Sequence, residues 1–283
     1  MKRVPLFALI AVSALLALHL STVGGQPPEP VVSEIHCKHF IFGYPLGAPA
    51  SNDLIIRDLY ALSSNDRTKF ADLVCYYLTP HETMGDLDLF RLWRNDPWLA
   101  EDETLEARPV ARDDYKDAHE MPAETRYDRG HQAPLASFKG SRFASQVNYY
   151  SNITPQRSDL NQAPWKRLED KVRELVSEYG EVWVMTRPLY EEEMPPLPHC
   201  DEEHTVPSGY WKIVVVSGAG ATQVAAFIME QDTDRYAEVQ DHLVTVADVE
   251  ERSGLSFFWE LPTAEQDALK SVTSESWVEE WFD

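Results

Sequence analysis

The sequence predicts an α+β domain built on an antiparallel sheet. Four apolar runs rich in β-branched and aromatic residues predict strands over residues 72–78, 181–185, 210–217 and 223–229. The last two runs flank the short glycine-containing segment 218–221, which indicates a hairpin. No repeat and no second change in composition interrupts the chain after residue 34. Strands mixed with a few helices and long loops are typical of an α+β domain.

Residues 164–179 give the strongest helix pattern in the chain. Pro164 is tolerated in the first turn of a helix, and Gly180 is a residue typical of a helix end. Between them, apolar side chains recur at steps of three and four residues, at Leu168, Val172, Leu175, Val176 and Tyr179. Shorter helices are predicted near residues 53–62, 264–272 and 275–282. Residues 80–126 look irregular and acidic, and long irregular connections within a domain are often functional.

The N-terminus has the pattern of a secretion signal. Lys2 and Arg3 precede an uncharged, largely apolar stretch, which ends in small residues before a proline-rich segment. We therefore divide the chain into a signal peptide (1–25), a linker (26–34) and one domain (35–283). An uncleaved anchor is the alternative, although the apolar stretch is short for a membrane span. Both interpretations predict export to the periplasm or the extracellular space, with no stable membrane partner unless the anchor is retained.

The three cysteines allow at most one internal disulfide. Cys75 lies in an apolar run that predicts a buried strand, so a core thiol is its simplest role. That would leave Cys37 and Cys200 as a pair, although sequence separation does not decide the pairing. Histidines lie near both of these cysteines, and a zinc site is a second interpretation, but the spacing matches no standard zinc pattern.

The motif with the most chemical content is Tyr-Asp-Arg-Gly-His-Gln-Ala-Pro at residues 127–134, which places His131 after an acid, a base and a glycine. It is followed by Ser-Asn-Ile-Thr-Pro-Gln at 151–156, and then by Asn161 and Glu169. An imidazole can activate water, while an amide and a carboxylate can hold a hydrated Mg²⁺. This set predicts a one-metal phosphodiester hydrolase, and therefore a nuclease.

These motifs resemble those of the sugar-non-specific DNA/RNA endonuclease family, the Serratia-nuclease type of His-Me finger enzyme, which is related to endonuclease G. The resemblance extends over about residues 35–270. It implies a ββα-metal finger set in a larger α+β fold. It also implies Mg²⁺ as cofactor, with Mn²⁺ as a substitute, and DNA and RNA as substrates that are cut to 5′-phosphate products.

The resemblance implies a role for each chemical group of the reaction. His131 matches the general base, and Asn161 matches the single protein ligand of the metal. Glu169 matches a carboxylate that reaches the metal through its waters. The alternatives are a helix-capping role for Asn161 and a solvated helix position for Glu169.

Several arginines and amides match positions that face the substrate. Arg91 matches the arginine that stabilises the transition state; Arg94, three residues away, is the alternative. Arg129 and Arg173 are expected to bind phosphate, and Arg173 could instead pair with Glu169. Asn152 and Gln156 resemble polar residues on the substrate side. We expect Asp128 to orient Arg129 or the local backbone.

The charge distribution indicates whether the protein can bind a polyanion. The net charge of −22 is unusual for a protein that meets a polyanion. Residues 129–173, however, contain eight bases and three acids, a local basic excess of the kind that phosphate contacts need. Two other classes remain open, a secreted phosphodiesterase or phosphomonoesterase for small substrates and a non-catalytic nucleic-acid-binding protein.

Overall fold

The computed structural model describes residues 34–88, 90–108, 112–123, 125–217, 222–273 and 275–282. The expected signal peptide (1–25), and the linker (26–34) apart from its last residue, lie outside the described residues. Within the described part of the chain, none of the helices combines the length and the apolar character that a membrane crossing requires.

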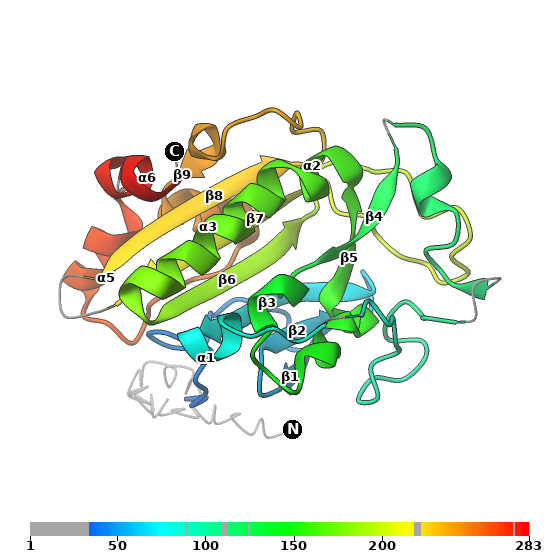
Figure 1. Ribbon diagram of the computed structural model, residues 1–283, viewed down its shortest axis with the longest axis horizontal. Helices are drawn as coiled ribbons and strands as arrows, with labels where there is room; N and C mark the ends of the chain where they lie inside the picture. Colours follow the sequence, from blue (N-terminus) through cyan, green and yellow to red (C-terminus); the bar gives the residue numbers. More distant parts are fainter. Residues whose placement is uncertain are drawn as a thin grey trace, which may run out of the picture. The chain divides into compact units, whose positions relative to one another are not determined.

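A seven-stranded antiparallel sheet forms the centre of the fold, in the order β1-β2-β3-β6-β7-β8-β9 (Figure 1). Its strands are β1 (Asp53–Ile56), β2 (Ala61–Asn65), β3 (Phe70–Leu78), β6 (Val182–Leu189), β7 (Gly209–Val216), β8 (Gln223–Glu230) and β9 (Leu243–Val244). Four of them match the predicted strands, except that residues 181 and 217 lie one residue outside β6 and β7, and Val216 pairs with Gln223 as the predicted hairpin requires. The turn at 218–221 lies outside the described residues. The predicted α+β class is confirmed.

Helices cover both faces of this sheet. They are α1 (Pro80–Thr83), α2 (Ser158–Gln162), α3 (Pro164–Tyr179), α4 (Val246–Ser253), α5 (Thr263–Lys270) and α6 (Glu275–Phe282), with short 3₁₀ turns η2 (Ala118–Glu120), η3 (Leu135–Phe138), η4 (Ala144–Asn148), η5 (Tyr150–Asn152) and η6 (Val239–His242). The predicted long helix is confirmed as α3, and Gly180 ends it in the left-handed conformation. The helices predicted near 264–272 and 275–282 are confirmed as α5 and α6.

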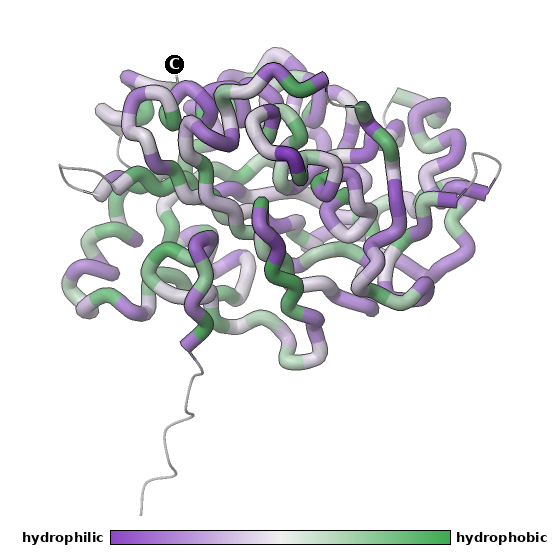
Figure 2. Tube along the Cα trace, turned by 60° about the horizontal axis from the view of Figure 1, so that its bottom comes forward, coloured by the Kyte–Doolittle hydropathy of each residue, from purple (hydrophilic) through white to green (hydrophobic). Residues whose placement is uncertain are grey.

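Strand β7 shows why the central strands are apolar along their whole length. Val214 packs with Leu168 of α3 in the core on one face, whereas Ile213 packs with Val249 of α4 in the core on the other. Successive side chains of a strand point to opposite faces, so both faces require apolar residues. Lys212 is the polar exception within β7 and is completely buried. Along the traces of the helices, hydrophilic and hydrophobic residues alternate (Figure 2), as expected where only one side packs on the core.

The helix predicted at residues 53–62 is wrong. This segment forms β1, a turn and the start of β2, in which Ile56 pairs with Ala61 and the Arg57 N–H donates to the Tyr60 carbonyl at 2.8 Å. Ile55 is buried and Ile56 is exposed, the alternation of an edge strand. The β-branched pair favours this arrangement over the helical spacing that the apolar residues also happen to fit.

A separate two-stranded ribbon carries the central sequence motif. β4 (Tyr127–His131) pairs with β5 (Ile153–Arg157), and the chain passes from β5 directly into α2. Ala163 breaks the helix there, so that Pro164 starts α3 as a new helix. The strands β4 and β5 followed by α2 and α3 form a ββα unit beside the main sheet (Figure 1).

Gly130 lies within β4, and its lack of a side chain is needed for packing. A Cβ added there would lie 2.6 Å from Gln156 Oε1 and 2.7 Å from Gln156 Cβ. The Gln156 side chain therefore lies against Gly130 in van der Waals contact, and any residue with a Cβ at position 130 would clash with it.

The region predicted to be irregular, residues 80–126, contains only α1 and η2 among its described residues. Side-chain contacts hold it in place. Leu105 and Tyr115 pack with Tyr127 of β4 in a third apolar cluster. Asp96 is buried, pairs with Arg57 and accepts a hydrogen bond from Ser151 Oγ at 2.5 Å. Polar contacts thus fix the path of a chain that has few backbone ladders of its own.

Candidate active site

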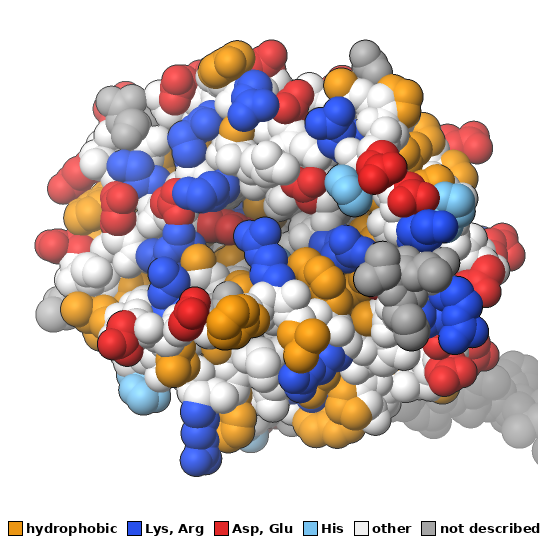
Figure 3. Space-filling view, turned by 45° about the vertical axis from the view of Figure 1, so that its right-hand side comes forward, with side chains coloured by type: hydrophobic (Ala, Val, Ile, Leu, Met, Phe, Trp, Pro, Cys, Tyr) orange, Lys and Arg blue, Asp and Glu red, His pale blue; other side chains and the backbone are white. Residues whose placement is uncertain are grey.

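A hollow of about 710 Å³ opens where β4, α2, the first turns of α3 and the segment around Arg91 meet. Six lysines and arginines and four carboxylates are among the described residues that line it. Figure 3 shows the side of the molecule that carries β4 and β5, where blue basic side chains gather across the middle of the face. Six of the eight predicted site residues line this hollow: Arg91, Arg129, His131, Asn161, Glu169 and Arg173.

His131, the last residue of β4, has one ring nitrogen fixed. Asn148 Nδ2 donates to the Phe90 carbonyl at 3.0 Å, so Asn148 Oδ1 is the atom 3.0 Å from His131 Nε2 and accepts its proton. The other ring nitrogen, Nδ1, is then free to act as a base. Burial lowers the pKa of His131 to about 4; the hydrogen bond that the ring donates to Asn148 opposes this shift, and the nearby Arg91 adds to it. The imidazole is therefore neutral at pH 7.

Asn161, in α2, is oriented by Asp128 of β4. Asn161 Nδ2 donates to Asp128 Oδ2 at 2.9 Å, and Gln162 Nε2 donates to the same oxygen at 2.8 Å. The other Asp128 oxygen accepts from Ser158 Oγ at 2.8 Å. Because its amide nitrogen is held, the Asn161 amide oxygen is left free to act as a metal ligand. Of the two roles expected for Asp128, orienting Arg129 is wrong, because Arg129 pairs with Asp113, and Asp128 instead orients side chains of α2. The alternative helix-capping role of Asn161 is not found at α3, whose N-cap residue is Ala163.

Glu169 lies on α3, on the helix after the one that carries Asn161. Beneath it, Lys212 Nζ lies 4.6 Å from the Trp165 ring centre and 3.4 Å from the Tyr76 hydroxyl. Burial raises the pKa of Glu169, while Lys212 and Arg173 oppose that rise. Burial likewise lowers the pKa of Lys212, and Glu169 opposes that change. The two charges stabilise each other across the base of the hollow.

The structure distinguishes Arg91 from Arg94. Arg91 is exposed and lines the hollow with His131. Arg94 does not line it, and its backbone pairs with the 148–150 segment, where its N–H donates to the Asn148 carbonyl at 3.2 Å. Of these two arginines, Arg91 is therefore the one whose position fits the expected contact with substrate.

The two arginines expected to bind phosphate, Arg129 and Arg173, are held by carboxylates. Arg129 donates to Asp113 Oδ1 at 2.6 Å and to the Tyr150 hydroxyl at 2.8 Å, and its guanidinium lies 5.5 Å from the Trp93 ring centre. Arg173 pairs with Asp170, and not with Glu169. Both guanidinium groups are thus fixed in position while they still line the hollow.

Asn152 and Gln156 do not line the hollow, which corrects the expectation that they face the substrate. Both are buried. Asn152 accepts the Ala133 N–H at 2.9 Å and donates to the carbonyls of Ala133 and Val147, so it ties together the turns around β4 and β5. Gln156 covers Gly130, as described above. Within this motif, polar side chains support the fold as well as the site.

Sequence reasoning missed three supporting residues, Asn148, Asp113 and Lys212. Asn148 ends the 3₁₀ turn η4, and Asp113 lies in an irregular segment. Neither belongs to a recognisable motif, and their partners are 17 and 16 residues away. The sequence does contain one indication of the role of Lys212, because a lysine within an apolar strand is buried only where it has a partner.

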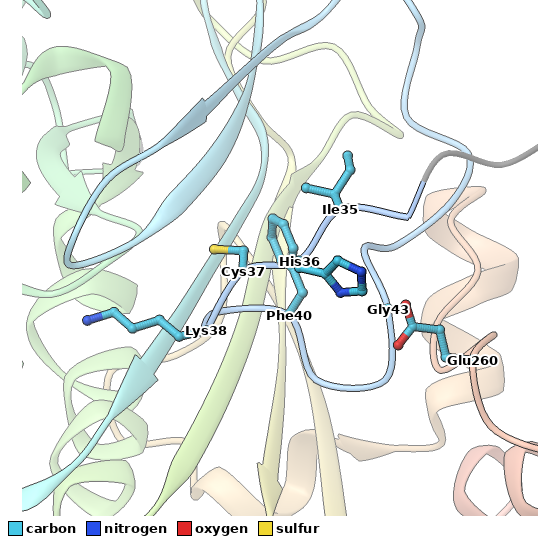
Figure 4. A pocket seen from close by; sticks show the side chains of 7 residues that line it. All are labelled: Ile35, His36, Cys37, Lys38, Phe40, Gly43 and Glu260. Atoms are coloured by element: carbon cyan, nitrogen blue, oxygen red, sulfur yellow. The ribbon is translucent and has the colours of Figure 1, made fainter.

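A second hollow, of about 430 Å³, lies at the start of the described chain (Figure 4). His36 and Cys37 both line it, but their side chains point in opposite directions. A disulfide between Cys37 and Cys200, which the sequence left open, is not formed, and all three cysteines are free thiols. This hollow therefore gives no support to a zinc site at Cys37.

Comparisons with known proteins agree with this geometry. The chain matches the family "DNA/RNA non-specific endonuclease" over residues 39–264. It is 41% identical over 232 residues to a nuclease of Serratia marcescens, covering 81% of this chain and 83% of that protein. It is 28% identical over 248 residues to human mitochondrial endonuclease G, covering 81% of this chain and 77% of that protein.

A solved structure of the EndoG/EndoGI complex shares the fold. Its match has a TM-score of 0.63 at 22% identity and covers 78% of this chain and 90% of that chain. The extent of the family match and the 41% identity to a nuclease confirm the resemblance first found in the motifs. The chain belongs to the family of DNA/RNA non-specific endonucleases, enzymes that hydrolyse phosphodiester bonds.

Proposed function

We propose that the protein is an exported, Mg²⁺-dependent endonuclease that cuts both DNA and RNA and leaves 5′-phosphates. The observation that carries this proposal is the gathering of His131, Asn161, Glu169 and Arg91 around one basic hollow. The N-terminal secretion pattern supports export. No base-reading element is evident in the sequence, so we expect weak sequence preference.

The residues present fit a hydrated Mg²⁺, for which Mn²⁺ would substitute. Asn161 supplies a free amide oxygen because Asp128 holds its nitrogen. Glu169 lines the same hollow and would reach the ion through its waters. When bound, the ion would neutralise phosphate charge and ease departure of the 3′-oxygen.

His131 is proposed as the general base. Its Nδ1 would take a proton from a water placed opposite the leaving 3′-oxygen, while Asn148 keeps the ring in the required tautomer. Arg91 would stabilise the extra negative charge of the pentacovalent transition state. Arg129 and Arg173, both fixed by carboxylates, would hold the phosphate backbone. No step uses the 2′-hydroxyl, which is why both sugars should be accepted.

The first prediction concerns the reaction itself. Supercoiled plasmid, single-stranded DNA and total RNA should all be degraded with Mg²⁺ and should survive when a chelator is present. Bis-nitrophenyl phosphate should be a much poorer substrate, because the hollow is suited to several phosphates. Gel assays with end-labelled oligonucleotides would also identify the 5′-phosphate. Cutting that persists in chelator, or that is confined to one sugar, would refute the proposal.

The second prediction concerns His131. His131→Ala should lower kcat by about 10²–10⁴-fold, the usual contribution of a general base. His119 lines the same hollow, but its side chain is exposed and lies 3.9 Å from a Glu120 carboxylate oxygen, so His119→Ala serves as the matched control. A His131→Ala rate within about tenfold of the native rate would remove His131 from the mechanism.

The pH dependence of His131 should follow from its burial. Its folded pKa of about 4 lies below the ordinary value of 6.5, so the imidazole should stay neutral at pH 5.5. Its contribution to stability is present above pH 6.5 and is lost as pH falls toward 4. An NMR titration of the ring, assigned with His131→Ala, would measure this pKa in the metal-free protein, and a midpoint near 6.5 would contradict the assignment.

The third prediction ranks the metal-facing residues. Asn161→Ala should raise the Mg²⁺ concentration for half-maximal rate more than Glu169→Ala, because Glu169 acts through waters. Asp128→Ala should raise it by about 10–100-fold, the usual cost of losing a residue that orients a ligand. Asp159→Asn, a carboxylate of the same hollow, is the control. A larger effect at Glu169 than at Asn161 would reverse the ligand assignment.

The fourth prediction separates the two arginines. Arg91→Ala should lower kcat by about 10²–10³-fold with little change in KM, since its partner charge develops mainly in the transition state. Arg94→Ala should change kcat by only a few-fold. Steady-state kinetics on one oligonucleotide would measure both variants, and equal losses would exclude Arg91 from this role.

A further inference from the structure

A second group of metal-binding side chains lies outside the hollow. Asp114, Cys200 and Glu202 each offer a ligand atom, and these atoms all lie within 4.8 Å of one another. None of the three lines the candidate active site. They come from two irregular connections, one before β4 and one between β6 and β7. The group therefore joins two parts of the chain that no strand pairing links.

Asp114 carries an unpartnered buried oxygen at this group. The residue is fully buried, and its Oδ2 accepts the Glu106 N–H at 2.5 Å. Its Oδ1 has no hydrogen-bond partner. An ionised carboxylate removed from water needs a compensating donor or cation. Cys200 is only a weak donor, and Glu202 is another acid, which compensates this oxygen only where the two acids share a proton.

The surrounding charges do not balance. One cation, Arg108, pairs with Glu106, with Asp201 at 3.0 Å and with Glu202 at 3.1 Å, but not with Asp114. His204 adds no charge, because its Nε2 accepts the Leu197 N–H at 3.0 Å. Among the described residues, the cation at this group is thus shared by Glu106, Asp201 and Glu202, and no cation pairs with Asp114.

We propose that Asp114, Cys200 and Glu202 bind a divalent cation of the zinc class. A thiolate is a ligand for Zn²⁺ and not for Mg²⁺ or Ca²⁺, which take oxygen ligands. Zn–S and Zn–O bond lengths place donors around a tetrahedral ion about 3.4–3.6 Å apart. Small side-chain movements would close the 4.8 Å spread to that value. Water would complete the coordination.

The cation would act as a structural link beneath the active site. Asp113, the residue before Asp114, accepts hydrogen bonds from Arg129 and from the Tyr150 hydroxyl. Fixing Asp114 to Cys200 and Glu202 would therefore also fix the support of Arg129. Structural ions serve this purpose where a segment has few backbone hydrogen bonds of its own. This inference does not depend on the catalytic roles proposed above.

The test uses the full chain, stripped with a chelator and then given Zn²⁺ or Co²⁺. We expect one equivalent of Zn²⁺ to remain bound through dialysis in excess Mg²⁺ and to raise the melting temperature. Co²⁺ should give the thiolate-to-metal absorption band that only a sulfur ligand produces. Cys200→Ser should abolish that band and weaken binding, whereas Cys37→Ser should leave both unchanged.

Two further ligand variants and one control variant test whether the bound cation occupies the proposed site. Asp114→Asn and Glu202→Gln should each lose Zn²⁺ retention, and Asn161→Ala should keep it, which separates this site from the catalytic one. A band that survives Cys200→Ser would overturn the proposal. The proposal would also be overturned if the Asp114→Asn variant had a higher melting temperature than the native protein and did not respond to Zn²⁺. The group would then be a pair of acids that share a proton.

Discussion

The Asp128 carboxylate is the contact on which the geometry of the candidate active site depends. It lies in β4, three residues before His131, and it accepts hydrogen bonds from Ser158, Asn161 and Gln162. One carboxylate thus sets the distance between the strand that carries the imidazole and the helix that carries the amide. Hydrogen bonds to a charged acceptor contribute about 1.5–3 kcal/mol each, more than neutral ones. They can hold a short helix of five residues that would not be stable alone.

The acidity of the chain has a structural use in the irregular region before β4. Asp96 holds the segment near Arg91 through Arg57 and Ser151, and Asp113 holds Arg129. A carboxylate has two oxygens and can accept from several donors at once. Buried carboxylates therefore replace the backbone ladders that this region lacks. A protein with a net charge of −22 can in this way position cations toward a polyanion.

The sequence predicts those elements that bury an apolar face. α3 follows from its spacing of Leu168, Val172 and Val176, and the central strands follow from their apolar runs, because these patterns reflect the two cores directly. The ribbon of β4 and β5 has no such pattern, since pairing and packing on distant segments define it. The segment 53–62 fits both helix and strand, and only its tertiary partners decide between them.

The candidate site shows the same division. Residue type and motif predicted that His131, Asn161, Glu169 and Arg91 lie around one hollow, and the structure places them there. Their catalytic roles stay predictions. Motif alone could not separate Asn152 and Gln156 from these residues, because an amide that braces a turn and an amide that binds substrate look alike in sequence. Asn148 is identified as a support by its 3.0 Å contact with His131, and Lys212 by the effect of the Glu169 charge on its pKa.

The placement of basic side chains within an acidic molecule also affects how a polyanion approaches. At low ionic strength the net negative charge repels nucleic acid over many ångströms, before any basic residue can act. At about 0.15 M salt, fields decay over about 8 Å, so the approaching strand responds mainly to the charges nearest to it. At that range it meets a hollow lined by six lysines and arginines. Moderate salt therefore favours the encounter, and only higher salt, which also screens these short-range contacts, opposes it.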